Sequence, residues 1–191
     1  EAAALPMTAQ AAWMAVITAG QVSAGQRVLI HGASGGLGSI AVQLAKWRGA
    51  FVMGTASGDN LRLVQSLGAD EVIDYRTTPF QSVVRDADMV LDTIGGRTQE
   101  DSWAVLKPGG ILVATATPPS PERAKAAGVR GTFIFTQPSG DVLAQIAEAV
   151  DSGNVRPVIG AEFALKDARQ AHELSESGRA RGKIVLYIGQ P

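Results

Sequence analysis

The residues with the clearest chemical meaning are glycines that follow a short aliphatic run. Residues 27–31 predict a strand, and Gly32-Ala-Ser-Gly-Gly-Leu-Gly38 follows directly, before apolar residues recur at helical spacing. A dinucleotide pyrophosphate needs backbone amides at a helix N-terminus, and glycines where a Cβ would block its approach. The G-x-G-x-x-G pattern is altered here to Ala33-x-Gly35-x-x-Gly38, but its position between strand and helix predicts dinucleotide binding. The alternative is a turn that serves tight packing alone.

The end of the second predicted strand indicates which dinucleotide to expect. An acidic side chain about 20 residues beyond the glycine turn would bind a ribose 2′-OH and repel a 2′-phosphate. The strand end reads Met53-Gly-Thr-Ala-Ser57, and no carboxylate appears before Asp59. Because a serine hydroxyl can donate to phosphate, this pattern favours NADP(H) over NAD(H). The cation that should accompany such a phosphate is not evident from spacing, and the candidates are Arg62, Arg76 and Lys183.

The elements that must position these residues alternate between strand and helix. Further strands are expected at residues 51–55, 71–74, 89–91, 111–115 and 132–135, and helices at residues 59–68, 97–106 and over the apolar face from Val142 to Val150. Asp59 is the expected N-cap of the first of these helices, and residues 117–121 form a stiff loop. Alternation of this kind demands crossover connections, so the sequence predicts an α/β fold with a doubly wound, six-stranded parallel (Rossmann) sheet.

Two flanking segments do not fit this alternation and suggest a partial second lobe. One is a helix expected at residues 5–19; the other is a tail with a strand at 162–165, a helix at 167–178 and a strand at 183–188. The expected division is residues 1–153 for the nucleotide-binding domain, including the leading helix, and residues 154–191 for the returning segment. The returning strands should therefore expose edges and apolar faces, or bury them against another subunit.

Composition narrows the chemistry that this chain of 191 residues can perform. It has 17 Lys and Arg against 18 Asp and Glu, so we expect no nucleic-acid partner and no attraction to an anionic membrane. It has no Cys, and its two histidines, His31 and His172, are far apart in sequence, so we expect no metal site. The apolar opening is interrupted by Pro6, Thr8 and Gln10 and lacks a basic leader, which predicts a cytoplasmic protein.

Several motifs in the same order resemble the medium-chain dehydrogenase/reductase superfamily. They occupy residues 28–38, 66–75, 90–96, 107–110 and 178–186. The resemblance is greatest to the zinc-independent quinone oxidoreductases, the relatives of zeta-crystallin. It implies that this chain holds the cofactor domain and the returning strands but not the N-terminal catalytic lobe. Zinc-dependent relatives carry their metal ligands in that lobe, so no zinc is expected in this chain.

The resemblance also implies a set of cofactor-binding residues. Thr8 would face the nicotinamide, and Asn60 stands where many relatives have a lysine for the 2′-phosphate. The other implied contacts are Ser34, Gly35, Gly36 and Leu37 at the pyrophosphate; Gly54 and Ser57 at the adenosine; Tyr75 and Lys183 at the 2′-phosphate; Ile94, Gly95, Ala116 and Thr117 at the riboses; and Phe133, Ile134 and Phe135 at the carboxamide.

Several of these residues have structural alternatives. Tyr75 could be a surface turn residue, and Ser57 an N-cap. Phe133 and Phe135 could pack in the core or against a second subunit. His31 is expected to be a hydrogen-bonded histidine beside the turn, and Asp92 to order the turn that follows its strand.

The resemblance implies an oxidoreductase in which NADPH delivers hydride to a quinone or an α,β-unsaturated carbonyl. No side chain in the chain is a convincing proton donor, so no catalytic residue is assigned.

A homodimer is implied through the sheet edge between Thr132 and Phe135. The alternatives are a nucleotide-binding module without turnover and the cofactor domain of a zinc-dependent alcohol dehydrogenase. A short-chain dehydrogenase is excluded, because Tyr75 and Tyr187 are each followed four residues later by proline rather than lysine.

Overall fold

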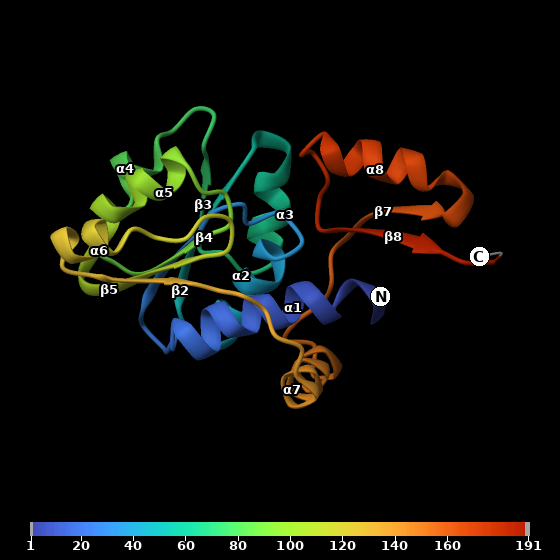
Figure 1. Cartoon of the computed structure of the whole chain (residues 1–191), viewed down its shortest axis with the longest axis horizontal. Helices are drawn as coiled ribbons and strands as arrows, with labels where there is room; N and C mark the ends of the chain where they lie inside the picture. The colour runs from blue at the N-terminus through green and yellow to red at the C-terminus, as the bar shows by residue number, and fades with distance from the viewer. Residues whose placement is uncertain (1, 190–191) are drawn as a thin grey trace.

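The computed structural model describes residues 2–189 and contains a six-stranded, fully parallel sheet (Figure 1). The strand order is β3-β2-β1-β4-β5-β6, so the chain reverses direction across the sheet between β1 and β4. This confirms the predicted doubly wound Rossmann sheet. The strands are β1 (Arg27–Ile30), β2 (Phe51–Ala56), β3 (Glu71–Asp74), β4 (Ala87–Asp92), β5 (Leu106–Ala114) and β6 (Arg130–Phe133).

Helices cover both faces of this sheet, because successive strand residues bury their side chains on opposite sides. In β1, Val28 and Ile30 join one core cluster and Leu29 joins another. One face packs against α1 (Pro6–Trp13), the π-helical segment η2 (Met14–Ala19), α2 (Gly38–Trp47), α3 (Leu61–Ser66) and α7 (Gly140–Asp151). The other packs against α4 (Phe80–Val83), α5 (Arg97–Ser102), the short η4 (Trp103–Val105) and α6 (Pro121–Ala127).

Some element boundaries differ from those predicted, for local reasons. The helix expected at 59–68 is α3, which follows the 3-10 turn η3 (Gly58–Asn60), so Asp59 does not cap it. The helix expected at 97–106 ends as η4, because β5 already starts at Leu106. The strand expected at 132–135 is β6, which ends at Phe133, although the Ile134 amide still donates to Ala114 O at 2.9 Å. Helices α4 and α6 were not predicted.

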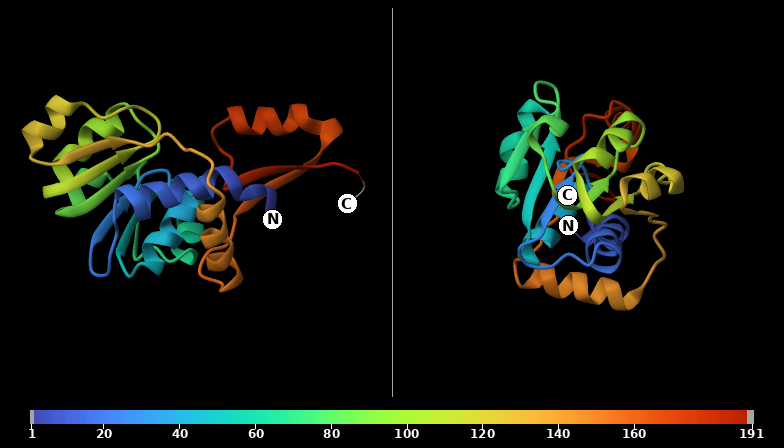
Figure 2. Two further views of the ribbon diagram at one scale, coloured as in Figure 1. Left: turned by 60° about the horizontal axis from the view of Figure 1, so that its bottom comes forward. Right: turned by 90° about the vertical axis from the view of Figure 1, so that its left-hand side faces the viewer.

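The returning segment forms a small lobe of its own beside the sheet (Figure 2). It consists of β7 (Ile159–Ala164), the turn η5 (Leu165–Asp167), α8 (Ala168–Glu176) and β8 (Lys183–Tyr187), so both expected strands are present with shifted bounds. The two strands pair in parallel, and α8 makes the crossover between them. Leu186 on β8 is exposed, as are Leu165 in η5 and Ile188 directly after β8, which agrees with the expected exposure of apolar residues in this segment.

Candidate cofactor-binding site

The glycine turn between β1 and α2 is a point of very close backbone approach. A Cβ on Gly38 would overlap the carbonyl oxygen of Gly32, so only glycine lets α2 begin this near to the end of β1. Gly32 itself has a φ of +66°, which favours glycine. The Ala33 amide donates to Thr55 O at 3.1 Å and fixes the turn against β2. Tight packing is therefore one role of this turn.

The same turn leaves backbone donors available at the start of α2. Within residues 2–189, no protein acceptor receives the amides of Ser34, Leu37 or Gly38, whereas Gly36 adjoins the carbonyl of Gly182 through the parallel bridge between Gly35 and Gly182. Unpaired amides at a helix N-terminus, together with the helix dipole, make a binding site for an anion such as phosphate. The turn thus has the donors that a pyrophosphate requires.

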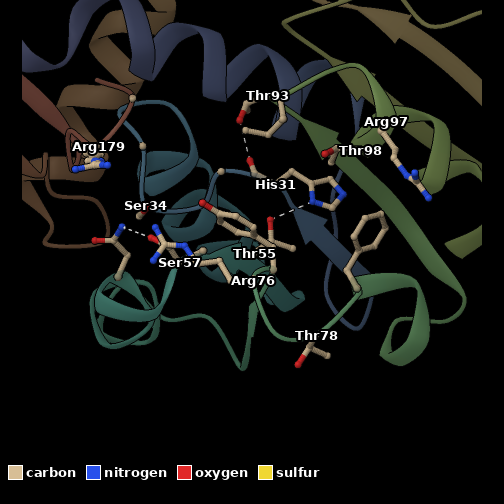
Figure 3. Close-up of a pocket in the computed structure, with 18 of the residues that line it drawn as sticks. His31, Ser34, Thr55, Ser57, Arg76, Thr78, Thr93, Arg97, Thr98 and Arg179 are labelled. Carbon is tan, nitrogen blue, oxygen red and sulfur yellow. Dashed lines mark hydrogen bonds between the residues drawn. The ribbon is translucent and has the colours of Figure 1, made fainter. Parts of the chain in front are cut away.

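A cavity of about 880 Å³ opens beside this turn (Figure 3). This volume is in the range of small-molecule and cofactor sites. Its walls come from the turn, the end of β2, the segment from Tyr75 to Gln81, the β4–α5 connection and the link between α8 and β8. It therefore lies at the carboxyl ends of the strands, where the order of the sheet reverses, which is where ligands bind in open α/β sheets.

His31 forms the buried floor of the cavity and is neutral. Its Nδ1 lies 3.1 Å from Thr55 Oγ1 and its Nε2 lies 3.0 Å from Ser102 Oγ, so both ring nitrogens are hydrogen-bonded. Burial lowers the pKa of His31 to about 4, against a smaller opposing effect of the Asp92 carboxylate. The expectation of a hydrogen-bonded structural histidine is confirmed.

Asp92 orders the turn at the end of β4. Its Oδ1 accepts from the amides of Ile94 and Gly95, at 3.0 and 2.9 Å, and its Oδ2 accepts from Gln99 Nε2 at 3.1 Å. The side chain is fully buried, and both of its oxygens accept hydrogen bonds from the turn and from α5. The predicted structural role of Asp92 is confirmed, and the turn places the exposed Ile94 side chain against the cavity.

The structure brings part of the predicted residue set to this cavity. The lining residues among that set are Ser34, Gly35, Ser57, Asn60, Tyr75 and Ile94. Those outside the lining are Thr8, Gly36, Leu37, Gly54, Gly95, Ala116, Thr117, Phe133, Ile134, Phe135 and Lys183. The cofactor contacts of both groups stay predictions.

Three of the residues outside the lining meet one another. A Cβ on Gly36 would lie 2.7 Å from Lys183 Cδ and 3.6 Å from Thr8 Cγ2, so Gly36 is covered by α1 and β8. Gly54 is likewise buried, since a Cβ there would lie 2.8 Å from Val64 Cγ1. Both glycines are required by packing within the chain, whatever else they contact.

The side of the cavity expected to recognise the adenosine ribose carries Ser57, Asn60 and Tyr75. Asn60 Nδ2 donates to Ser57 Oγ at 3.1 Å, while Asn60 Oδ1 is buried without a hydrogen-bond partner. The Ser57 side chain therefore bonds to a side chain and does not cap the following turn. Tyr75 is 57% exposed. An unpaired buried amide atom at a cavity wall is a group that a bound polar ligand would satisfy.

Four arginines line the cavity, and three of them were not assigned to it from the sequence. Arg76 was a candidate cation, and the fold places it at the cavity, whereas Arg62 and Lys183 lie outside the lining. Arg97, Arg179 and Arg181 were missed; the motif Gly178-Arg-Ala-Arg-Gly182 was the available signal. Arg97 contacts Asp101 at 3.4 Å, but within residues 2–189 no ion pair involves Arg76, Arg179 or Arg181.

The cationic side chains come from both parts of the chain. Arg76 follows β3, while Arg179 and Arg181 lie in the link before β8, which the Gly182 amide attaches to Ser34 O at 2.9 Å. In Figure 3, Arg179 and Ser34 appear on one side of the cavity, and Arg97 and Thr98 on the other. The cavity can therefore hold an anionic ligand against the glycine turn. Within residues 2–189, no group of His, Asp and Glu side chains is placed to hold a metal ion.

Comparison with known proteins agrees with this site. The pattern of the zinc-binding dehydrogenase family matches residues 67–186, more than half of the chain. The chain belongs to this family. The family name alone does not place zinc in this chain, which has no Cys.

Several relatives of this chain are named oxidoreductases. The chain is 36% identical to the zebrafish (Danio rerio) mitochondrial NAD(P)H oxidoreductase RTN4IP1 and 35% identical to the Arabidopsis thaliana chloroplastic NADPH-dependent alkenal/one oxidoreductase, over 98% of this chain in each case. It covers 57% and 47% of those proteins. The quinone oxidoreductase structure from Coxiella burnetii matches 96% of this chain and 59% of its own, at 33% identity and a TM-score of 0.89.

These likenesses confirm a cofactor domain of the quinone oxidoreductase type within the medium-chain superfamily. The chain spans about half to three-fifths of the length of these relatives.

No helix among residues 2–189 is long and apolar enough to cross a membrane.

The buried neutral His31 should make stability pH-dependent. Because its pKa falls from 6.5 when unfolded to about 4 when folded, the unfolded chain binds more protons between these values, and lowering the pH from about 7 to about 4.5 should cost about 2 kcal/mol of folding free energy. Urea unfolding at about pH 7 and about pH 4.5 measures this loss. The His31→Gln variant should show a smaller loss over the same interval, whatever its stability at neutral pH. An equal loss in both proteins would show that His31 is not the group responsible.

Proposed function

We propose that this chain is the NADPH-binding part of an oxidoreductase that reduces quinones or α,β-unsaturated carbonyls. The observation that carries this proposal is the single cavity that joins the unpaired amides of the glycine turn to a group of arginines. The printed activities of the alkenal/one oxidoreductase and quinone oxidoreductase relatives support the substrate class.

The residues of the cavity can be assigned in turn to the pyrophosphate, the adenosine ribose and the 2′-phosphate of NADP(H). The turn amides would hold the pyrophosphate, while Ser57, Asn60 and Tyr75 would contact the adenosine ribose. Arg76 and Arg179 would neutralise a 2′-phosphate, to which a guanidinium can donate two parallel hydrogen bonds. No carboxylate lines the cavity between Ser34 and Arg76, so nothing there selects for a free 2′-OH. NADP(H) is therefore the proposed preference, with Asn60 in place of the lysine of many relatives.

The chain's role in the reaction is to position the cofactor and to keep other reactive groups away from it. NADPH supplies the hydride when bound. The neutral His31 floor adds no charge below the cofactor, and the saturated Asp92 keeps the β4 turn fixed. Gly36 adjoins both Thr8 and Lys183 beyond the lining. Because Thr8 is expected at the nicotinamide, we propose that this group adjoins the nicotinamide end, in place of the pyrophosphate and 2′-phosphate contacts expected for Gly36 and Lys183. Because the chain spans only part of its relatives, turnover is proposed for the longer protein, with the substrate bound partly by residues outside this chain.

The relatives are named for different cellular compartments. A cytoplasmic location was expected from the sequence, but the zebrafish relative is named mitochondrial and the Arabidopsis relative chloroplastic. The location of this protein therefore stays a prediction.

The proposed 2′-phosphate site predicts a preference that one substitution should remove. NADPH should bind this chain at least about tenfold more tightly than NADH, as measured by paired calorimetric titrations. Arg76→Gln should weaken NADPH binding by about tenfold and leave NADH binding unchanged, because only NADPH carries the extra phosphate. The matched control is Arg62→Gln, an exposed arginine outside the cavity. Equal affinities in the unaltered chain would contradict the NADP(H) preference.

The proposed reaction can be tested on a polypeptide extended to the length of the relatives. It should oxidise NADPH only when a quinone or a 2-alkenal is present, and the product should be the hydroquinone or the saturated aldehyde. The 191-residue chain alone should bind NADPH without turnover, because part of the substrate cleft lies outside it. Oxidation of NADPH by the extended protein with alcohol-derived ketones but not with enones would instead favour alcohol dehydrogenase activity.

We also propose that β6 forms a homodimer contact. This strand is at the edge of the sheet, with β5 as its only neighbour among residues 2–189, and Phe133 and Phe135 near its end are 38% and 78% exposed. Both phenylalanines are thus excluded from the core of this chain. An antiparallel pairing of two β6 edges about a twofold axis would be self-complementary and would cover them.

This contact predicts a concentration-dependent dimer in sedimentation equilibrium. The double variant Phe133→Asp and Phe135→Asp should be monomeric at concentrations where the unaltered chain dimerises, since it places like charges across the shared edge. Leu165→Asp, an exposed apolar position on the returning lobe, is the control and should leave the dimer intact. A monomeric unaltered chain at high concentration would refute the proposal.

A further inference from the structure

The cavity ends, on the side of Arg97 and Thr98, at a polar pair that the proposed phosphate contacts do not use. Gln81 on α4 donates from Nε2 to Asp101 Oδ2 on α5 across 3.4 Å, and both residues line the cavity. Arg97 Nε contacts the same oxygen at 3.4 Å, from a side chain that is largely exposed. The pair therefore joins two helices that face each other across one end of the cavity.

Two acceptors of this pair are unused. Within residues 2–189, no hydrogen bond reaches Asp101 Oδ1 or Gln81 Oε1. The contact between Gln81 Nε2 and the carboxylate orients the amide so that its oxygen is the atom left over. Both residues line the cavity, so two unused acceptors belong to a wall that also contains the apolar Pro79 and Phe80.

The charge of Asp101 restricts which part of a ligand it can face. It is the only carboxylate among the described residues that line the cavity. Arg97 contacts it, and the other three lining arginines lie elsewhere on the wall. A carboxylate beside a phosphate would repel it, whereas a carboxylate beside an N–H donor accepts a strong hydrogen bond. A dinucleotide has two flat groups with an N–H donor at the edge, the adenine base with its exocyclic amine and the nicotinamide with its carboxamide. Because the nicotinamide is proposed to lie beside Thr8, Gly36 and Lys183, outside the lining, the adenine base is the group left for this end of the cavity.

We propose that Asp101, together with Gln81, recognises the exocyclic amine of the adenine base and selects adenine over 6-oxopurines. The proposal rests on the proposed function and adds a determinant of base specificity. The amine offers two hydrogens to the two free acceptors, while the base packs against Pro79 and Phe80. A hypoxanthine base would place its 6-oxygen against these acceptors, and a site built for a donor rejects an acceptor strongly.

The experiment compares NADPH with its hypoxanthine analogue, in which an oxygen replaces the amine. Calorimetric titration of the 191-residue chain should give NADPH an affinity at least about tenfold higher. Asp101→Asn should reduce this ratio to about threefold or less, because the new amide can donate to the 6-oxygen. Asp101→Glu, which keeps a carboxylate, should retain a ratio above that of Asp101→Asn.

Matched controls separate this effect from misfolding and from failure of the cofactor assignment. Glu100→Gln alters the neighbouring carboxylate on α5, which binds Arg123 outside the cavity, and should leave the ratio unchanged. Thermal unfolding of each variant should show a folded protein. NADPH binding with the same ratio in Asp101→Asn would overturn the role of Asp101 and leave the proposed function standing. Binding of neither dinucleotide by the unaltered chain would overturn both.

Discussion

The close approach of α2 to the end of β1 is the constraint on which the rest of the site depends. Because a Cβ on Gly38 would overlap Gly32 O, the helix starts directly beneath the turn and directs its free amides outward. The turn is then held from two further directions, by Thr55 of β2 and by Gly182 of the returning segment. Three parts of the chain that are distant in sequence therefore meet at one short run of backbone, and the cavity is the space between them.

The hydrogen bonds around His31 extend this constraint across the sheet. Its ring links β1 to Thr55 on β2 and to Ser102 at the end of α5, and Thr93 Oγ1 donates to His31 O at 2.8 Å. The ring also meets Phe80 edge-on at 4.5 Å between centroids, which connects α4 to the same group. A charged imidazolium would have to be buried in this network, so the neutral form is the one compatible with the fold. The positive charge of the cavity is consequently carried by its arginines and not by its floor.

The sequence was sufficient to predict the sheet but not the whole site, and the difference has a physical cause. Strands buried on both faces and long amphipathic helices repeat over enough residues to be recognised, as for β1 and α2. Helices α4 and α6, with four and seven residues, are too short for a periodic pattern, so both were missed, and with α4 the cavity wall that contains Phe80 and Gln81. Arg179 and Arg181 reach the cavity only because Gly182 pairs with the glycine turn, a contact that no local spacing encodes. Conversely, Ser57 and Tyr75 follow their strands directly, and strand ends can be read from the sequence.

The distribution of charge also refines the argument from composition. A net charge of −1 argues against binding a long polyanion, yet it says nothing about a cavity in which arginines outnumber carboxylates. These arginines surround a space of about 880 Å³ that the returning segment partly closes, and they do not spread along an open face. The scale of the positive region is therefore that of a few phosphate groups on one small molecule. Because two of the arginines belong to the returning segment and one follows β3, a phosphate held between them would tie the small lobe to the sheet. The affinity for an anionic cofactor and the orientation of the two parts of the chain are then properties of the same contacts.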